Sequence, residues 1–140
     1  MQTLQQQRAK FALNRVKEAA NQLDTKNKKE YKSYASALPF MIHANGLGQA
    51  AAFYRSKGEK DTHFLLYKLL SDWLTGNVNI DGFNKENQPF YGHDDLLEGI
   101  TNEKMPVYMT AQAEAMVFMN WVKRFADAFM RGDEQHGENP

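Results

Sequence analysis

Apolar residues recur every three or four positions over much of the chain, which is the spacing of one face of an α-helix. Residues 2–23 predict a long first helix, whose core face holds Ala9, Ala12, Val16, Ala19, Ala20 and Leu23. A last helix is predicted from Pro106 onward, with a core face of Ala111, Ala115, Phe118, Val122, Phe125 and Phe129. Between them, residues 63–75 predict a shorter helix with Leu66, Leu70, Trp73 and Leu74 on one side.

Residues 34–58 are predicted to form the hub against which the longer helices pack. Apolar side chains recur there every four positions, and Pro39 interrupts the pattern, so a kinked helix is expected. Asn45 and Gly46 then permit a tight corner, because glycine adopts left-handed backbone conformations at little cost. A second short helix follows at once and ends at Gly58.

The remaining segments are polar or irregular. Residues 24–30 are expected to be a connector, and residues 77–93 a long irregular loop without helical or strand periodicity. A short helix capped by Asp94 follows that loop. The sequence therefore predicts an all-α fold: one compact bundle of five or six helices over residues 1–132, followed by a frayed acidic tail, 133–140.

Composition excludes several classes of protein. The chain has no cysteine, so neither a disulfide framework nor a thiolate metal site is expected. No apolar run approaches the roughly 20 residues needed to span a membrane, and the first residues lack the apolar stretch of a secretory signal. We therefore expect a cytoplasmic protein that makes no membrane contact.

The net charge of zero conceals a strong asymmetry. Residues 1–70 contain 12 Lys and Arg against 5 Asp and Glu, a balance of +7, and residues 71–140 contain 5 against 12, a balance of −7. Such a division favours a polyanionic partner for one face or head-to-tail association of copies. The alternative is chance clustering on a solvated surface.

The basic half supplies the candidate RNA-binding residues, which are Arg8, Lys10, Arg15, Lys17, Lys26, Lys28, Lys29, Lys32, Arg55 and Lys57. On the first helix, Leu4, Arg8, Phe11 and Arg15 form a second stripe that points almost opposite to the core face. This stripe is suited to nucleic acid or to a protein neighbour. Alternatively, Phe11 packs beneath another element of the same chain, and the lysines belong to a solvated loop.

Signatures of catalysis are weak. His93-Asp94 is a dipeptide typical of metal-dependent phosphohydrolases, but Asp94 is equally explained as a helix cap. Glu114 lies in an apolar arc and is expected to be paired with a lysine, a tyrosine hydroxyl or free helix N–H groups. We expect no catalytic residue, no metal and no cofactor.

Two blocks of residues resemble a known family. The first comprises Tyr34, Leu38-Pro39, Ile42, Asn45-Gly46-Leu47, Gln49, Phe53 and Ser56-Lys57. The second comprises Thr110, Glu114-Ala115 and Trp121-Val122-Lys123-Arg124-Phe125-Ala126. In this order they resemble the small α-helical subunit of the type III-B CRISPR Cmr complex, an RNA-guided effector that targets RNA in antiviral defence.

This resemblance implies a non-catalytic subunit whose copies stack beside the backbone subunits of the complex. Its partners would be other Cmr subunits, further copies of itself, the guide RNA and the target RNA. The resemblance makes Arg124, together with Lys123, a candidate RNA contact, although both also stand near Asp127. Met116 and Met130 either fill the core or form an adaptable partner surface. A protein-only helical adaptor and a metallohydrolase with the His-Asp pair are the alternative functions.

Overall fold

The computed structural model describes residues 2–131 and contains no strand within them. Its α-helices are α1 (Leu4–Gln22), α2 (Thr25–Ser56), α3 (Thr62–Thr75), α4 (Leu96–Asn102) and α5 (Met105–Phe129), with a 3₁₀ turn at Lys85–Asn87. The predicted all-α fold is confirmed. The acidic tail, 133–140, lies outside the described residues.

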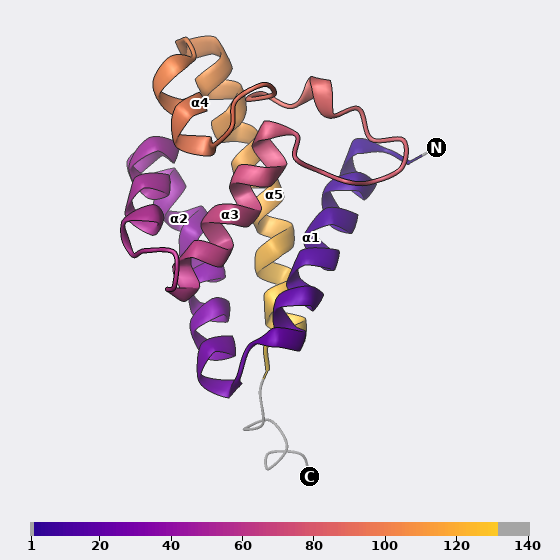
Figure 1. The fold of residues 1–140 in the computed structure, drawn as a ribbon, viewed down its shortest axis with the longest axis vertical. Helices are drawn as coiled ribbons and strands as arrows, with labels where there is room; N and C mark the ends of the chain where they lie inside the picture. Colours follow the sequence, from indigo (N-terminus) through magenta and orange to yellow (C-terminus); the bar gives the residue numbers. More distant parts are fainter. Residues whose placement is uncertain (1, 132–140) are drawn as a thin grey trace.

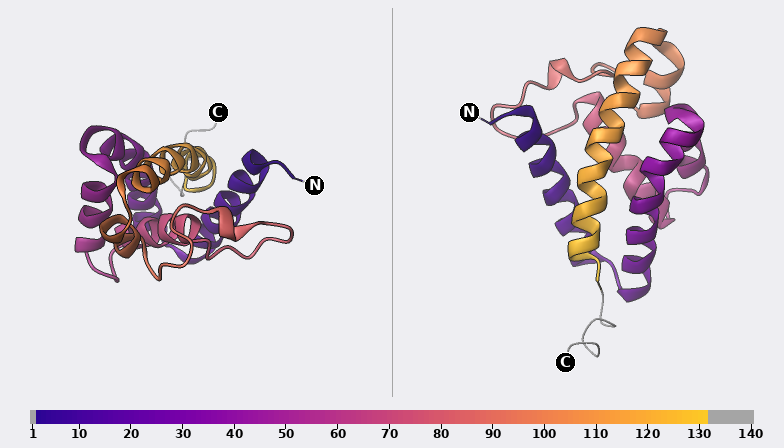
Figure 2. Two further views of the ribbon diagram at one scale, coloured as in Figure 1. Left: turned by 90° about the horizontal axis from the view of Figure 1, so that it is seen from above. Right: turned by 180° about the vertical axis from the view of Figure 1, so that it is seen from behind.

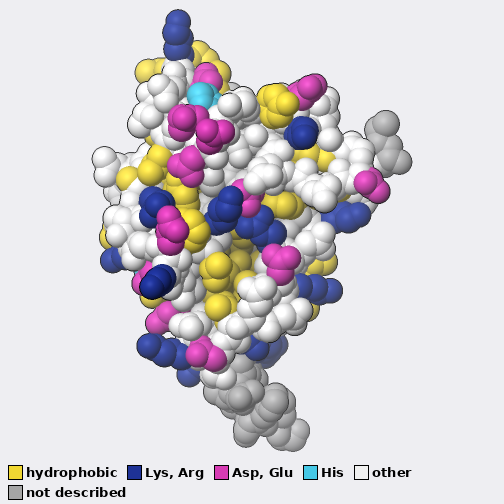
Figure 3. Space-filling view, viewed as in Figure 1, with side chains coloured by type: hydrophobic (Ala, Val, Ile, Leu, Met, Phe, Trp, Pro, Cys, Tyr) yellow, Lys and Arg dark blue, Asp and Glu magenta, His cyan; other side chains and the backbone are white. Residues whose placement is uncertain are grey.

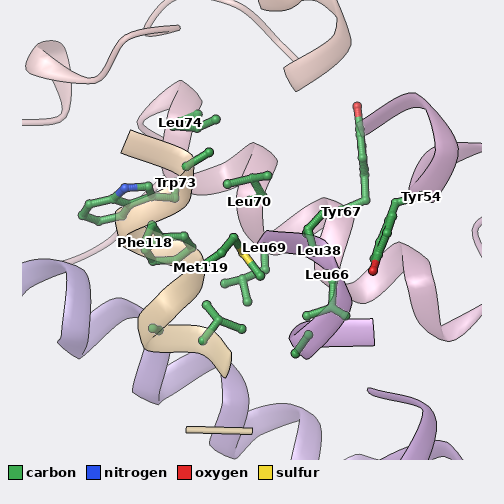
Figure 4. Packing of buried hydrophobic residues seen from close by; sticks show 14 of the residues in the cluster. Leu38, Tyr54, Leu66, Tyr67, Leu69, Leu70, Trp73, Leu74, Phe118 and Met119 are labelled. Atoms are coloured by element: carbon green, nitrogen blue, oxygen red, sulfur yellow. The ribbon is translucent and has the colours of Figure 1, made fainter. Parts of the chain in front are cut away.

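Helix α5 is the central element of the bundle. It packs against α1 on one side and α2 on the other, and α3 lies across the opposite side of the core (Figures 1 and 2). The Trp73 ring stacks on Phe118 at the middle of the core, with centroids 4.9 Å apart (Figure 4). Buried leucines of α3 continue this core toward α2. None of the helices in residues 2–131 combines the length and apolarity needed to cross a bilayer.

Helix α2 begins earlier than predicted. The expected connector, 24–30, belongs almost wholly to the helix, because the Asp24 side chain accepts a hydrogen bond from Asn27 N at 2.8 Å and caps its first turn. The first turn carries no apolar residue, so hydrophobic periodicity did not reveal it. Burial of Tyr31 one turn later anchors this polar start to the core.

The predicted corner at Gly46 is present. Within α2, Gly46 alone departs from helical dihedral angles, with φ 88° and ψ 158°, and Pro39 stays inside the helical segment. Two side chains of α5 satisfy the free N–H groups of the segment that follows. Gln112 Oε1 accepts from Leu47 N, and the Tyr108 hydroxyl accepts from Gly48 N, both at 2.8 Å.

The irregular segment 77–93 covers the carboxyl end of α3. Gln88 Nε2 donates to Trp73 O at 2.6 Å, and Phe90 N donates to Leu74 O at 2.9 Å, so two carbonyls at the helix end gain partners. The Phe90 ring is fully buried and lies directly against Gly99 of α4. The segment is thus a packed part of the fold.

The cap of α4 is Asp95 and not the predicted Asp94. Its side chain accepts from Leu97 N at 3.1 Å and from the Tyr67 hydroxyl at 2.6 Å. Burial, followed by the hydrogen bond to Asp95, raises the pKa of Tyr67, so this hydroxyl remains a donor. The hydrogen bond from Tyr67 of α3 favours Asp95 over Asp94 as the cap. The spacing of residues in the sequence does not reveal this bond.

Candidate nucleic-acid interface

Arg8 lies against the core rather than on the outer surface. Its guanidinium donates to Glu114, from Nε to Oε2 at 2.6 Å and from Nη2 to Oε1 at 2.7 Å. Trp73 Nε1 donates to the same carboxylate at 2.9 Å. The hydrogen bond to Glu114 is the main cause of the raised pKa of Arg8. Glu114 is paired as expected, but with an arginine and a tryptophan, and the predicted outward orientation of Arg8 is wrong.

Arg15 also turns toward the same chain. Its Nη1 donates to Asp72 Oδ2 at 2.8 Å, and its guanidinium carbon lies 5.3 Å from the centroid of the Phe11 ring. Asp72 is buried and also accepts from Lys68 and Asn77. Since a buried carboxylate needs such compensation, Arg15 is a structural partner in this chain.

Phe11 is a core residue, with an exposed fraction of 7 %. Its ring centroid lies 5.6 Å from that of Trp73 and 6.0 Å from that of Phe118. Helix α1 is covered both by α5 and by α3, so Phe11 of its second stripe is buried as well as its first stripe. The outward stripe was wrong for Phe11, and the alternative of packing within the chain is confirmed. Leu4, at the start of the stripe, is exposed.

The other two basic residues of α1 face solvent. Lys10 and Lys17 lie on the side away from Arg8 and Arg15, and the Lys17 ammonium is 5.4 Å from the centroid of Phe129. Phe129 is 41 % exposed, so its predicted place in the core is wrong. Met130, the C-cap of α5, is buried in its stead, and its N–H donates to Ala126 O at 2.9 Å. The prediction of Met130 as a partner surface is therefore also wrong.

Four lysines lie in the first two turns of α2. Lys26 and Lys29 are exposed, Lys28 and Lys32 are half-buried, and none of the four forms an ion pair within residues 2–131. An open groove separates this part of α2 from the end of α5. Its lining includes Lys29, Lys32, Ser33, Ala37, Asp127 and Met130.

Lys123 and Arg124 line a second open groove, between α5 and the start of α1. Gln5, Val117, Asn120 and Trp121 complete its lining. No ion pair joins Asp127 to Lys123 or Arg124 in the described part of the chain, so the local pairing that their spacing allows is not formed. Met116 is half-buried and packs against the core.

Arg55 and Lys57 are held by contacts near the end of α2. Arg55 pairs with Glu59 at 3.1 Å and lies 5.4 Å from the centroid of Phe64. The Lys57 ammonium lies 4.5 Å from the centroid of Phe53. These two cations stand beyond the Gly46 corner, apart from the lysines at the start of the helix.

The solvent-facing cations of three helices form one surface, which we call the basic face. Its residues come from α1, α2 and α5, whose ribbons lie side by side in Figure 2 (right), and the cations of α2 and α5 line grooves there. Its members are Lys10, Lys17, Lys29, Lys32, Lys123 and Arg124. No residue from 31 to 58 is acidic, and Asp127 is the carboxylate that lines its α2–α5 groove. Such a surface attracts polyanions.

Acidic residues gather at the other end of the molecule. Residues 76–104 contain six Asp and Glu against two Lys, a balance of −4, and they cover the end that bears α4. In Figure 3 acidic side chains and a histidine gather below the upper tip, which carries one basic side chain, and basic side chains predominate along the lower edge. The folded chain is therefore also asymmetric in charge, with an excess of acidic residues at the end that bears α4.

His93 is held by two carboxylates at the acidic end. Its Nε2 lies 2.7 Å from Glu103 Oε2, and its Nδ1 lies 3.2 Å from Glu98 Oε1. The hydrogen bond to Glu103, followed by that to Glu98, raises the pKa of His93. The site ties the loop to α4 and to the turn before α5.

This arrangement offers little to a metal-dependent hydrolase. Both ring nitrogens of His93 are engaged, and His63 stacks on Tyr34 with centroids 3.6 Å apart while bonding to Asp61 at 2.6 Å. Among residues 2–131 no group of three His, Asp or Glu side chains has a geometry that would hold a metal ion.

Comparison with known proteins agrees with these features. The family described as CRISPR-associated protein (Cas_Cmr5) matches residues 4–129. The CRISPR system Cmr subunit Cmr5 of Thermus thermophilus is 29% identical over 130 residues, covering 93% of this chain and 98% of that protein.

The likeness extends to three dimensions. The crystal structure of a CRISPR-associated Cmr5 family protein from Thermus thermophilus superposes with a TM-score of 0.69 at 27% sequence identity. The superposition covers 91% of this chain and 98% of that one. From the match over most of its length, the chain belongs to the Cas_Cmr5 family of CRISPR-associated proteins.

Proposed function

We propose that this chain is a structural, non-catalytic subunit of a type III-B CRISPR Cmr complex, and that its basic face contacts the backbone of the guide and target RNA. The observation that carries the proposal is the combination of family membership with six cations, exposed or half-buried, on one side. Base pairing between guide and target supplies sequence recognition in RNA-guided effectors, so such a subunit needs only phosphate contacts.

Ion pairing within the chain supports a smaller set of proposed RNA contacts. Arg8 and Arg15 pair with carboxylates of the same chain, so we do not assign them to RNA binding. The remaining candidates are the lysines of α1 and α2, together with Lys123 and Arg124. If about four phosphates are neutralised, the logarithm of the affinity for single-stranded RNA falls with the logarithm of salt with a slope near −3, about −0.7 per contact. Binding by one copy is weak and independent of sequence.

Charge reversal in the groove tests this interface. The double variant Lys29→Glu, Lys32→Glu should weaken binding of every RNA sequence alike and flatten the salt slope. Lys85→Glu, an exposed lysine at the acidic end, is the matched control and should change neither quantity. Fluorescence anisotropy over a salt series measures both. Equal effects of the two variants would contradict a localised RNA-binding face.

Copies of the subunit are further proposed to stack head to tail. The acidic end that bears α4 and the basic α1–α2 corner lie at opposite ends of the long axis, so their charges are complementary between successive copies (Figures 1 and 3). Weak phosphate binding by each copy then becomes strong when neighbours occupy one strand. Sedimentation with and without a long single-stranded RNA measures this association.

A protein-only adaptor is the second candidate function. Met105 and Met109 are exposed on consecutive turns of α5, and flexible methionine side chains suit adaptable protein contacts. This function predicts RNA binding that is absent or insensitive to the basic-face substitutions, together with loss of complex assembly on Met105→Ser, Met109→Ser.

A further inference from the structure

Phe40 is the most exposed aromatic side chain in the part of the chain that the structure describes. Its exposed fraction is 72 %, and within residues 2–131 its ring has no aromatic or cationic partner. The exposed rings of Phe53 and Phe129, by contrast, are each covered by a lysine ammonium. A single exposed phenylalanine is common in soluble proteins, so its surroundings decide its role.

The surroundings of Phe40 are uncrowded, and lysines precede it on the same face of α2. Lys29 precedes Phe40 by eleven residues, about three helical turns, so the two side chains project within about 20° of each other and about 16 Å apart along α2. Ser33 and Ser36 lie between them on the same face, and their short side chains leave the ring open. The ring thus extends the lysine-lined groove along the outer side of α2.

Charge distinguishes between a nucleic acid and a protein as occupant. The residues from 31 to 58 include no carboxylate, whereas the groove at the start of this face presents Lys29 and Lys32. Asp127 of α5 is the acidic side chain opposite them. A protein partner that packed an apolar side chain on Phe40 would gain nothing from the two lysines in this groove. An aromatic ring beside a cationic track is the arrangement that binds single-stranded nucleic acids.

We propose that Phe40 is a stacking platform for an unpaired base of RNA, and that phosphates further along the same strand lie on Lys29 and Lys32. This inference rests on the proposed RNA contact and adds a base-binding element to it. Because every base presents a π-face, the platform is indifferent to sequence but distinguishes RNA from a bare polyanion. Phe40 is therefore a binding residue of an interface otherwise made of phosphate contacts.

Abasic RNA provides a direct test, since it keeps the phosphates and lacks the bases. The full chain should bind a short oligouridylate on the order of fivefold or more tightly than the abasic oligomer of equal length. Phe40→Leu, which keeps an apolar side chain but no π-face, should lose that preference and leave abasic binding unchanged. Phe40→Trp should keep or increase the preference. Phe53→Leu, on the same helix beyond the corner, is the matched control and should behave as wild type.

The possible results separate this inference from the proposed function. If Phe40→Leu retains the preference for bases, the platform is wrong while the phosphate contacts stand. If Phe40→Leu binds both oligomers as wild type does but no longer joins the other Cmr subunits, Phe40 is a protein anchor and the platform is wrong. If the wild-type chain binds neither oligomer at low salt, the proposed RNA contact fails and the platform fails with it.

Discussion

Replacing Glu114 by alanine tests how the bundle is held together at its centre. The carboxylate accepts two bonds from Arg8 and one from the Trp73 indole, and the two charged side chains are only 12 % and 16 % exposed. Glu114→Ala therefore leaves a guanidinium and an indole N–H in a poorly solvated site. Breaking a buried ion pair costs about 3–5 kcal/mol, and the residual exposure of Arg8 reduces this to about 2–4 kcal/mol.

Urea denaturation followed by circular dichroism measures the loss. With an m-value of about 1.5 kcal/mol per molar urea, the midpoint should fall by about 1.3–2.7 M. The surface pair between Arg55 and Glu59 provides the control, because Glu59→Ala at an exposed site should cost no more than about 1 kcal/mol. A loss for Glu114→Ala as small as that of the control would show that water reaches the central pair and would refute this reasoning.

A double substitution separates the ion pair from the packing. Arg8→Met with Glu114→Leu removes both charges and fills the space with apolar side chains, so the loss should shrink to about 1–2 kcal/mol, the cost of leaving the Trp73 indole N–H without an acceptor. The Trp73 indole N–H loses its Glu114 acceptor in this variant, so its stability should stay somewhat below that of wild type. If the double variant is as unstable as Glu114→Ala, the loss arises from the tryptophan and not from the unpaired arginine.

Three further predictions concern the corner, the loop and pH. Gly99→Ala should destabilise by about 1–3 kcal/mol in urea denaturation, because the added Cβ would lie 2.5 Å from the Phe90 ring. Gly46→Val should cost about 1–3 kcal/mol in the same assay, because φ of 88° with ψ of 158° is a region that only glycine occupies readily. The carboxylate of Glu103 raises the pKa of His93, so the pair stabilises the fold below the unfolded value near pH 6.5 and this contribution is lost as pH rises through the folded pKa. Melting temperatures of wild type should therefore fall, relative to His93→Ala, between about pH 6 and 8.

Matched substitutions serve as controls for these predictions. Gly48→Ala lies in a helix with its nearest neighbours at 3.4 Å and should be nearly neutral. His43→Ala, at an exposed histidine that forms no ion pair within residues 2–131, should leave the pH profile unchanged. Equal stability of the alanine variants at positions 99 and 48 would contradict the close contact with the loop. A pH profile for His93→Ala that matches wild type would contradict the role of its carboxylate partners.

Sequence patterns predicted most of the helices because the bundle buries single faces with regular spacing. They failed where one helix is buried on two sides, as at Phe11. This residue stands between two arginines on its side of the helix, and such a pattern is typical of a solvent-exposed face. They also failed at helix ends. The polar start of α2 lacks apolar periodicity, and at the end of α5 the capping residue Met130 is buried where Phe129 was expected.

The candidate site was harder to predict than the fold. The charge distribution and the family resemblance pointed to the basic half of the chain as the RNA-binding part. Ion pairing within the fold, however, decides which of its cations are free to bind phosphates. Arg8 and Arg15 find carboxylates 106 and 57 residues away, and no local pattern reveals such partners. Phe40 was overlooked because it adjoins Pro39 within an apolar run, which favours burial. The Asp95 cap depends on a tyrosine of another helix and was missed by one position for the same reason.

Mapping of RNA–protein crosslinks in a Cmr complex assembled with the full chain tests the central claim most directly. The complex would be purified from the native host under mild conditions, irradiated, and digested, and the crosslinked peptides would be identified by mass spectrometry. The account predicts crosslinks to guide or target RNA in the first half of α2 and around Lys123 and Arg124, with none in residues 76–104. Recovery of the chain with Cmr subunits but with RNA crosslinks confined to other subunits, or to the acidic end of this one, would contradict it.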